Sequence, residues 1–330
     1  MDEVPVVINS FLAYKETIQN CSPLTVKEYY NDLRTFFRYI IAKRGGKDLS
    51  ELEQVDISSV DLTLAGSVST DEIYSFLLFL SKEKNNRSAA LARKLSAIKS
   101  FYKYHTQKSK KLTENPAREI DSPNIKHPLP KYLSLDESIR LLKSIKSDSI
   151  TKERDYCIIT LFLNCGMRLS ELVGIDLNDI SDDMSKLTVT GKGRKMRTIY
   201  LNDACRNALE AYLKVRAQKA MSKGKTIIDK NALFLSGKNR RISNKTVQWL
   251  IKKQLAESGL EGKGYSVHKL RHTAATLMYN TGNVDIRALQ DILGHEQLNT
   301  TQIYTHVSDK KLEEAMKANP LSNINTDKEN

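Results

Sequence analysis

The spacing of apolar residues predicts a helical N-terminal part. In residues 22–41 and again in residues 88–105, apolar side chains recur close to every 3.6 positions, as they do on one face of a helix. Residues 43–68 carry Gly, Ser and Asp with little periodicity, so we expect a connector with one short helix there. Ser or Thr followed three residues later by Glu marks helix starts: Thr25 with Glu28, Ser69 with Glu72, and Ser134 with Glu137.

Prolines mark the boundary between two domains. Residues 115–130 hold four of the seven prolines in the chain. Because proline removes a hydrogen-bond donor and fixes an extended path, we predict a linker at 116–130. This gives an N-terminal domain at 1–115, a second domain at 131–321, and a polar tail at 322–330 that we expect to be disordered.

The second domain has one β interruption in a helical pattern. Residues 187–190 and 197–201 are rich in β-branched side chains and flank the glycine-punctuated turn 191–196, which predicts a β-hairpin. The predicted fold class is therefore mainly α (α+β), with a helical N-terminal domain and an α-rich domain that carries a small antiparallel β-sheet. Helical periodicity returns in four later stretches, at 204–215, 244–257, 269–279 and 284–293.

Charge indicates a polyanionic partner. The chain has 52 Lys and Arg against 39 Asp and Glu, a net charge of +13 with a pI of about 9.4. Nucleic acid is the first candidate and an anionic membrane surface the second. The polar face of the 88–105 helix is basic, so we expect phosphate contacts there rather than a merely solvated face. The residues concerned are Arg87, Arg93, Lys94, Lys99 and Lys103.

Several classes of protein do not fit this sequence. No apolar run reaches the roughly 18–20 residues of a membrane span, and the start Met1-Asp2-Glu3 lacks the basic and apolar stretches of a signal peptide. The four cysteines lie far apart without a Cys-x-x-Cys pair, which argues against disulfides and a cysteine zinc site. We therefore predict a cytoplasmic protein with reduced thiols.

Arg168 is the first candidate for chemistry. It follows Gly166, which interrupts the apolar helix over 158–163. An arginine beside such a break can direct its guanidinium at an anion. An ordinary surface arginine paired with Glu171 also fits, and is the simpler interpretation when the residue is considered alone.

Residues 268–272, His-Lys-Leu-Arg-His, form the densest reactive cluster. His268 and Arg271 share a helix face because they are three positions apart. His268 and His272 could hold zinc, but Lys269 stands where a zincin needs Glu, and no acidic ligand follows at a useful distance. We therefore predict no metal, and a core histidine bonded to a carbonyl is the alternative for one of the two imidazoles.

Further candidates follow turns. Lys192, with Arg194 beside it, lies between glycines at the hairpin tip, His295 follows Gly294 at a helix end, and Tyr304 comes nine residues later. Each alone fits an ordinary surface or core residue. Together with two arginines, they supply what attack on a phosphodiester needs: positive charge on the phosphate oxygens, a nucleophile, a general acid and imidazoles.

In order and spacing, these segments resemble the tyrosine recombinases (phage-type integrases), and within them the compact Xer type. Twenty-four residues lead from Arg168 to Lys192 and again from Arg271 to His295. Residues 22–41 also resemble the start of the helical core-binding domain in that family. The matching segments are 164–172, 190–195, 268–273, 293–295 and 304–306.

The resemblance implies a role for each matching residue. Tyr304 would attack the scissile phosphate and form a 3′-phosphotyrosyl link, which conserves bond energy, so no metal or other cofactor would be required. Arg168 and Arg271 would hold the phosphate. The remaining roles would be Lys192 protonating the leaving 5′-oxygen, His268 exchanging the tyrosine proton, His295 hydrogen-bonding a non-bridging oxygen, and Glu171 in support.

The resemblance also implies partners. We expect duplex DNA with an inverted-repeat core site, and a homotetramer on two such sites with a C-terminal helix at 309–319 exchanged between protomers, or else docked on its own domain. A paralogous recombinase or an activating protein is a further expected partner. The implied function is Xer-like chromosome dimer resolution in the nucleoid. Alternatives are a mobile-element integrase, a type IB topoisomerase and a catalytically idle DNA-binding protein.

Overall fold

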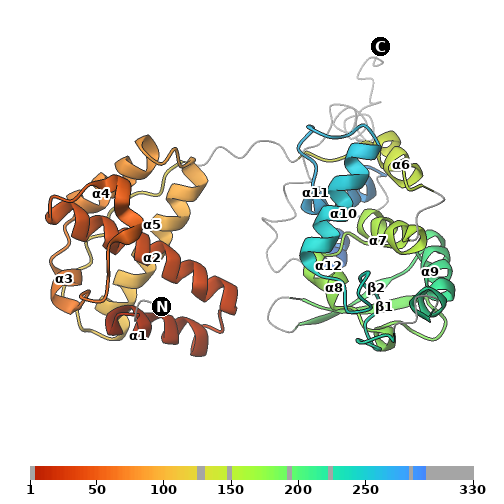
Figure 1. Ribbon diagram of the computed structural model, residues 1–330, viewed down its shortest axis with the longest axis horizontal. Helices are drawn as coiled ribbons and strands as arrows, with labels where there is room; N and C mark the ends of the chain where they lie inside the picture. The colour runs from red at the N-terminus through yellow and green to blue at the C-terminus, as the bar shows by residue number, and fades with distance from the viewer. Residues whose placement is uncertain are drawn as a thin grey trace, which may run out of the picture. The chain divides into compact units, whose positions relative to one another are not determined.

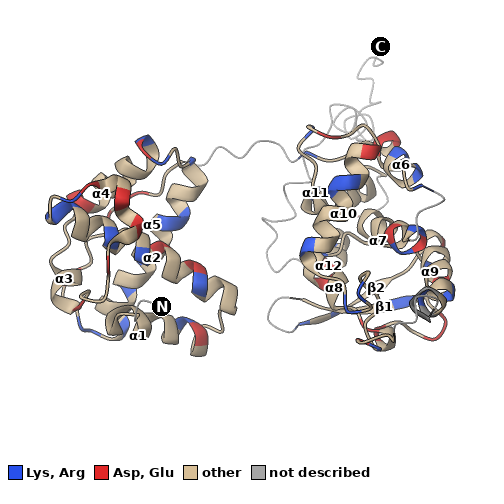
Figure 2. Cartoon of the chain, viewed as in Figure 1, with Lys and Arg blue, Asp and Glu red and all other residues tan. Residues whose placement is uncertain are grey.

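Contacts within the chain divide it into two compact units, Met1–His127 and Pro128–Asn330 (Figure 1). The computed structural model describes residues 4–124, 131–146, 151–191, 195–221, 226–281 and 285–294. Figure 2 shows basic and acidic residues interspersed along the helices of both units.

The N-terminal unit is all helical in its described residues. Its helices are α1 Val6–Thr17, α2 Pro23–Arg44, η1 Leu49–Gln54, α3 Leu62–Gly66, α4 Thr70–Lys82, α5 Ser88–Lys103 and the π-helical turn η2 Tyr104–Lys108. The core contains aromatic rings in edge-to-face contact, such as Phe11 with Phe101 and Phe36 with Phe76. Such pairs add specific geometry to the burial of apolar area.

Two of the predicted helix starts are confirmed and one is wrong. Capping boxes begin α4, through Ser69, and the later helix α6 (Leu135–Lys143), through Ser134. Thr25 does not cap α2, because Ser22 stands at the N-cap and accepts the Thr25 backbone N–H at 3.1 Å. A proline at the first helical position, Pro23, explains the earlier start.

The 43–68 stretch is part of the core rather than a plain connector. It contains two short helices, η1 and α3, where the sequence predicted one. The side chains of Leu52, Ile57 and Val60 are buried against the longer helices, and acidic residues cap its turns. Ala117 and Ile120, beyond residue 115, are buried in the same core.

The C-terminal unit surrounds the apolar helix α7, which packs against α9 and α11. A two-stranded antiparallel sheet pairs Lys186 with Tyr200, which confirms the predicted hairpin and the mainly helical fold class. Besides α6, its elements are α7 Lys152–Cys165, α8 Leu169–Gly174, η3 Leu177–Asp179, β1 Lys186–Thr190, β2 Met196–Tyr200, α9 Asp203–Met221, α10 Asn244–Glu257, α11 Val267–Asn280 and α12 Ile286–Leu293.

None of the helices in the described ranges combines the length and the apolar character that crossing a membrane demands.

Candidate active site

A left-handed turn places Arg168 at the end of the central helix. Helix α7 ends at Gly166, whose φ of 57° is a conformation that favours glycine. The chain then runs extended through Arg168, which is the N-cap residue of α8. The local sequence, a glycine two positions before the arginine, therefore directs this side chain out of the apolar core.

Glu171 is a buried carboxylate that holds two arginines. Its side chain has no exposed surface and accepts the backbone N–H and the Nη1 of Arg168, both at 2.7 Å, and the Nη2 of Arg197 at 2.9 Å. Burial alone would raise the pKa of Glu171, but the Arg168 backbone hydrogen bond and the Arg197 charge lower it below its ordinary value. The predicted pairing of Arg168 with Glu171 is thus present.

Arg271 lies inside the C-terminal unit on α11, with 3% of its surface exposed. Its Nη1 donates to the Gly166 carbonyl and its Nη2 to the Leu293 carbonyl, both at 2.7 Å. These bonds fix the guanidinium between the ends of α7 and α12. Arg168 reaches the same end of α12, where its Nη2 donates to the Gly294 carbonyl at 2.6 Å.

His268 stands at the start of α11, one turn before Arg271. Partial burial of its ring and the neighbouring positive charges of Arg271 and Lys269 lower its pKa. A neutral imidazole at physiological pH can accept a proton, as a general base must. The ring packs edge to face on His272 with centroids 4.7 Å apart, while His272 itself is only 7% exposed.

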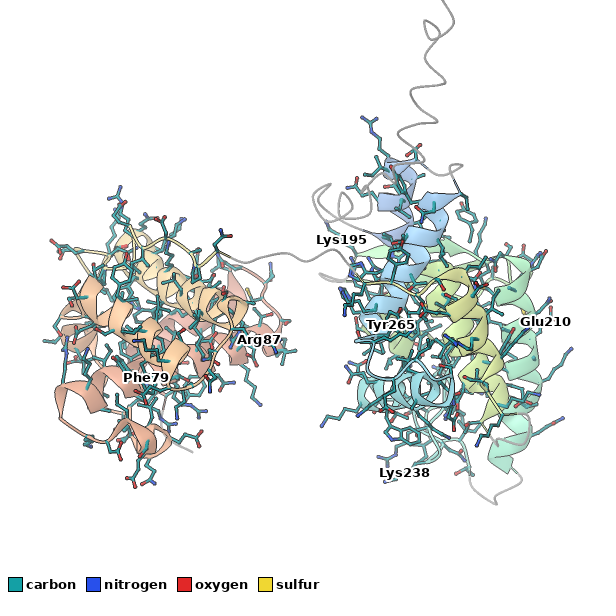
Figure 3. All side chains as sticks on the ribbon, turned by 90° about the horizontal axis from the view of Figure 1, so that it is seen from above. Phe79, Arg87, Lys195, Glu210, Lys238 and Tyr265 are labelled. Carbon is teal, nitrogen blue, oxygen red and sulfur yellow. The ribbon has the colours of Figure 1, made fainter. Side chains whose placement is uncertain are left out.

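The side chains of Arg168, His268 and Arg271 line one groove of about 1100 Å³. Arg168, His268 and Arg271 come together there from α8 and α11, and α10 adds Asn244, Gln248 and Lys252 to the lining. Tyr265, labelled in Figure 3, also lines the groove. Two guanidinium groups and an imidazole around one open groove are the side chains that an anion site with a proton acceptor beside it would need.

Five of the predicted features lie outside the described residues: Lys192, Arg194, His295, Tyr304 and the 309–319 helix. The residues that precede two of them are described and lie at the site. A Cβ on Gly191 would be 3.4 Å from the Glu171 Oε1, and a Cβ on Gly294 would be 3.6 Å from the Arg168 Nη1. The hairpin and α12 therefore both lead up to the arginine pair.

The basic residues predicted on α5 divide into two kinds. Arg87, labelled in Figure 3, and Lys103 are exposed, and Lys99 is half-buried. Arg93 and Lys94 both pair with Asp32, a carboxylate buried in the N-terminal core. These two therefore also neutralise a buried charge within the fold, which a periodicity argument cannot reveal.

Arg197 is a site residue that the sequence did not single out. It lies on β2 opposite Val189. Its side chain is 14% exposed, and its guanidinium reaches Glu171 and the Ile292 carbonyl. In the sequence it lies within a predicted strand and next to no glycine or histidine motif that would mark it as a site residue. No group of three or more His, Cys, Asp or Glu side chains in the described ranges is placed to hold a metal ion.

Family models match both units. The phage integrase family model matches residues 131–311, and the phage integrase N-terminal SAM-like domain matches residues 8–109. The chain belongs to the phage integrase family. Among curated phage integrase relatives, a tyrosine recombinase XerC of Caldanaerobacter subterraneus subsp. tengcongensis is 52% identical, over 96% of this chain and 88% of that protein. A XerC of Thermodesulfovibrio yellowstonii is 33% identical, over 98% and 99%.

Solved phage integrase structures share the fold. A XerH site-specific recombinase bound to a palindromic difH substrate aligns with a TM-score of 0.68 at 21% identity, over 95% of each chain. The Tn1549 transposon integrase, in complex with transposon right end DNA, aligns with a TM-score of 0.68 at 19% identity, over 94% of this chain and 98% of that one. The solved structures therefore show a shared fold, while the family models and the two XerC relatives identify the protein as a tyrosine recombinase of the Xer kind.

Proposed function

We propose that this recombinase cuts and rejoins duplex DNA at a specific site through a covalent bond to Tyr304. The observation that carries the proposal is the convergence of Arg168, Arg271 and His268 on one groove. A phosphodiester under attack gathers negative charge on its non-bridging oxygens, and preorganised guanidinium groups stabilise that charge. The bonds of both arginines to backbone carbonyls, and the bond of Arg168 to Glu171, provide this preorganisation.

Arg168 retains capacity for a phosphate. A guanidinium carries five N–H donors, and Glu171 and the Gly294 carbonyl take two of those of Arg168. The remaining donors can bind phosphate oxygens that enter the groove. Because Arg168 is about one-third exposed, it can meet such an anion without leaving its protein partners.

The chemical step then follows from the residue types. The Tyr304 hydroxyl attacks the phosphorus and passes its proton to His268, whose neutral state suits it as the acceptor. The bond to the 5′-oxygen breaks as Lys192 donates a proton to it, while His295 hydrogen-bonds a non-bridging oxygen. The product is a 3′-phosphotyrosyl link and a free 5′-hydroxyl, and rejoining is attack of a partner 5′-hydroxyl on that link.

The partners follow from this chemistry. Residues 1–115 and 131–321 would hold opposite faces of duplex DNA with an inverted-repeat core site, the first through Arg87, Lys99 and Lys103. Exchange between two DNA sites needs four active sites, so the assembly would be a homotetramer. Its protomers would exchange the 309–319 helix. A paralogous recombinase or an activator would complete the assembly. We infer chromosome dimer resolution rather than mobile-element integration, because the near relatives carry the Xer name. A location at the nucleoid is part of the same proposal.

Covalent trapping tests the proposal. Wild-type protein is incubated with sheared DNA of its own host, the mixture is denatured, and protein-linked fragments are captured and sequenced. We expect one short inverted-repeat site to be enriched with wild type and absent with Tyr304→Phe, although the variant still binds that DNA. Absence of any linked DNA, even with host extract added, would leave only a DNA-binding protein.

A further inference from the structure

The end of α12 is held by three arginines from three different elements. They bind three consecutive carbonyl groups: Arg197 of β2 donates to Ile292, Arg271 of α11 to Leu293, and Arg168 at the start of α8 to Gly294. The last carbonyls of a helix lack partners within the helix and carry partial negative charge, so cations stabilise this end. The predicted phosphate ligands and this helix end are therefore one hydrogen-bonded assembly.

Arg197 differs from the other two in what it can reach. Arg168 and Arg271 line the groove, whereas Arg197 does not. Its Nη2 binds the Glu171 Oε2 and its Nη1 the Ile292 carbonyl. Because the Arg197 side chain is only 14% exposed and does not line the groove, we expect any effect of Arg197 on the reaction to pass through these two partners.

The side chain of Arg197 also lies against the turn that ends α12. Gly294 has a φ of 63°, and a Cβ at this position would stand 2.8 Å from the Arg197 Cδ and 2.9 Å from its Nε. The absence of a side chain on Gly294 is what permits this approach. His295 is the next residue in the chain, so Arg197 is in contact with the residue immediately before a proposed phosphate ligand.

We propose that Arg197 is a positioning residue, which holds Arg168 in place through Glu171 and the end of α12 in place through the Ile292 carbonyl. This inference rests on the proposed recombinase function. A displacement of about 1 Å at a reacting centre can cost about 100-fold in rate. A planar guanidinium can serve two acceptors on different elements at once, and the single ammonium group of a lysine cannot match that geometry.

The first measurement separates DNA binding from cleavage. Arg197→Gln is compared with wild type in single-turnover cleavage of a nicked duplex carrying the trapped site. We expect DNA affinity within about threefold of wild type, and a cleavage rate lower by about 10- to 100-fold, the range seen when a residue that orients a ligand is lost. Arg216→Gln is the matched control, because Arg216 also holds backbone carbonyls, those of Leu233 and Ala232, outside the groove. It should cleave at the wild-type rate.

The second measurement separates positioning of Arg168 from a general structural defect. A methylphosphonate at the scissile position replaces one charged non-bridging oxygen by a methyl group, so the charge that Arg168 balances is gone. If Arg197 acts through Arg168, the cleavage rate of Arg197→Gln on this substrate should come within about threefold of the wild-type rate. A loosened fold would slow cleavage of both substrates by the same factor.

The possible outcomes distinguish a failure of the proposed function from a failure of the inference about Arg197. If wild type forms no covalent product with any DNA, the proposed function fails. If wild type cleaves, and Arg197→Gln either matches it or loses the same factor on both substrates, the inference about Arg197 is wrong. Should Arg197→Gln fail to fold in a thermal melt, Arg197→Lys is measured on the same two substrates. Arg197→Lys retains the charge, and the inference again requires that it slow cleavage of the normal phosphate more than cleavage of the methylphosphonate.

Discussion

Gly166 lies so close to Leu293 that a Cβ on the glycine would approach the leucine Cδ2 to 2.8 Å. Gly166 ends α7 and Leu293 ends α12, and both offer their carbonyls to Arg271. The left-handed φ of Gly166 provides the sharp exit from α7 that leads to Arg168 two residues later. One glycine thus determines both the packing of two helix ends and the direction of Arg168, a proposed phosphate ligand.

We expect Gly166→Ala to destabilise the C-terminal unit by about 1–3 kcal/mol. A non-glycine residue in the left-handed region costs roughly 1–2 kcal/mol, and the displaced Leu293 adds to this. For a unit of this size, each kcal/mol lowers the melting temperature by about 2–4 °C. Thermal denaturation should show a lower midpoint for Gly166→Ala. Gly174→Ala, where an added Cβ has open space, should change stability by no more than about 0.5 kcal/mol, and equal losses would refute the steric explanation.

Replacement of the buried carboxylate should be costly as well. Glu171→Gln keeps the shape of the side chain but removes the charge that two guanidinium groups share. Breaking a buried ion pair costs about 3–5 kcal/mol, and since Arg168 is partly exposed we expect about 3 kcal/mol in urea unfolding at pH 7. Glu261→Gln, an exposed acid at the same groove, should cost less than about 0.5 kcal/mol.

The Glu171 contribution should depend on pH in a defined direction. The folded pKa lies below the ordinary value of 4.5, so its stabilisation is fully present above the unfolded pKa and is lost as the pH falls through the folded pKa. The difference between wild type and Glu171→Gln should therefore narrow as the pH falls below about 4.5. A constant difference down to pH 3 would mean that folding does not lower the pKa of Glu171.

Local sequence rules predicted those features that local chemistry decides. A serine followed three residues later by glutamate was enough to place the starts of α4 and α6. β-Branched residues around glycines predicted the hairpin, and Gly166 marked the end of α7. Helix α1 was missed because Pro5 stands at its N-cap and supplies no side-chain hydrogen bond.

The site depends on contacts that no local rule contains. Arg197 meets Ile292 across 95 residues of sequence, and Lys94 meets Asp32 across 62. Spacing within a helix identified His268 and Arg271 as neighbours, but the partners of each arginine are set by how α7, α11 and α12 pack. Which basic side chains serve the fold therefore becomes visible only in three dimensions.

His105 should make the N-terminal unit sensitive to mild acid. Its ring is fully buried and its Nε2 lies 3.0 Å from the Val7 carbonyl. Burial lowers the pKa of His105 below its ordinary value of 6.5, so the stability it confers is present above the unfolded pKa and is lost as the pH falls through the folded value. We expect a loss of up to about 1.4 kcal/mol per pH unit below pH 6.5.

Hydrogen exchange on the full chain, followed by mass spectrometry, can check this. Peptides from α1 and α5 should exchange faster at pH 5.5 than at pH 7, after correction for the intrinsic pH dependence of exchange. His105→Gln retains a donor for Val7 but does not titrate, so its peptides should lack that difference. If both proteins respond alike, another group is responsible for the acid sensitivity.

Substitutions of two basic residues in the α5 region should affect different properties, DNA binding in one case and stability in the other. Arg87 is exposed at the N-cap of α5, whereas the Lys94 ammonium lies 3.0 Å from the buried Asp32 carboxylate. Arg87→Gln should weaken DNA binding and reduce the slope of log affinity against log salt by about 1, because one phosphate contact is lost. Its thermal midpoint should match that of wild type.

Lys94→Gln should show the reverse pattern. Asp32 would keep only Arg93 as a cationic partner among those described, and an incompletely compensated buried carboxylate should cost about 1–3 kcal/mol. The salt slope of DNA binding should be unchanged, because the ammonium is occupied within the fold. Melting curves and salt titrations of the two variants side by side decide the matter. A reduced salt slope for Lys94→Gln, at wild-type stability, would instead make Lys94 a phosphate ligand and its pairing with Asp32 dispensable.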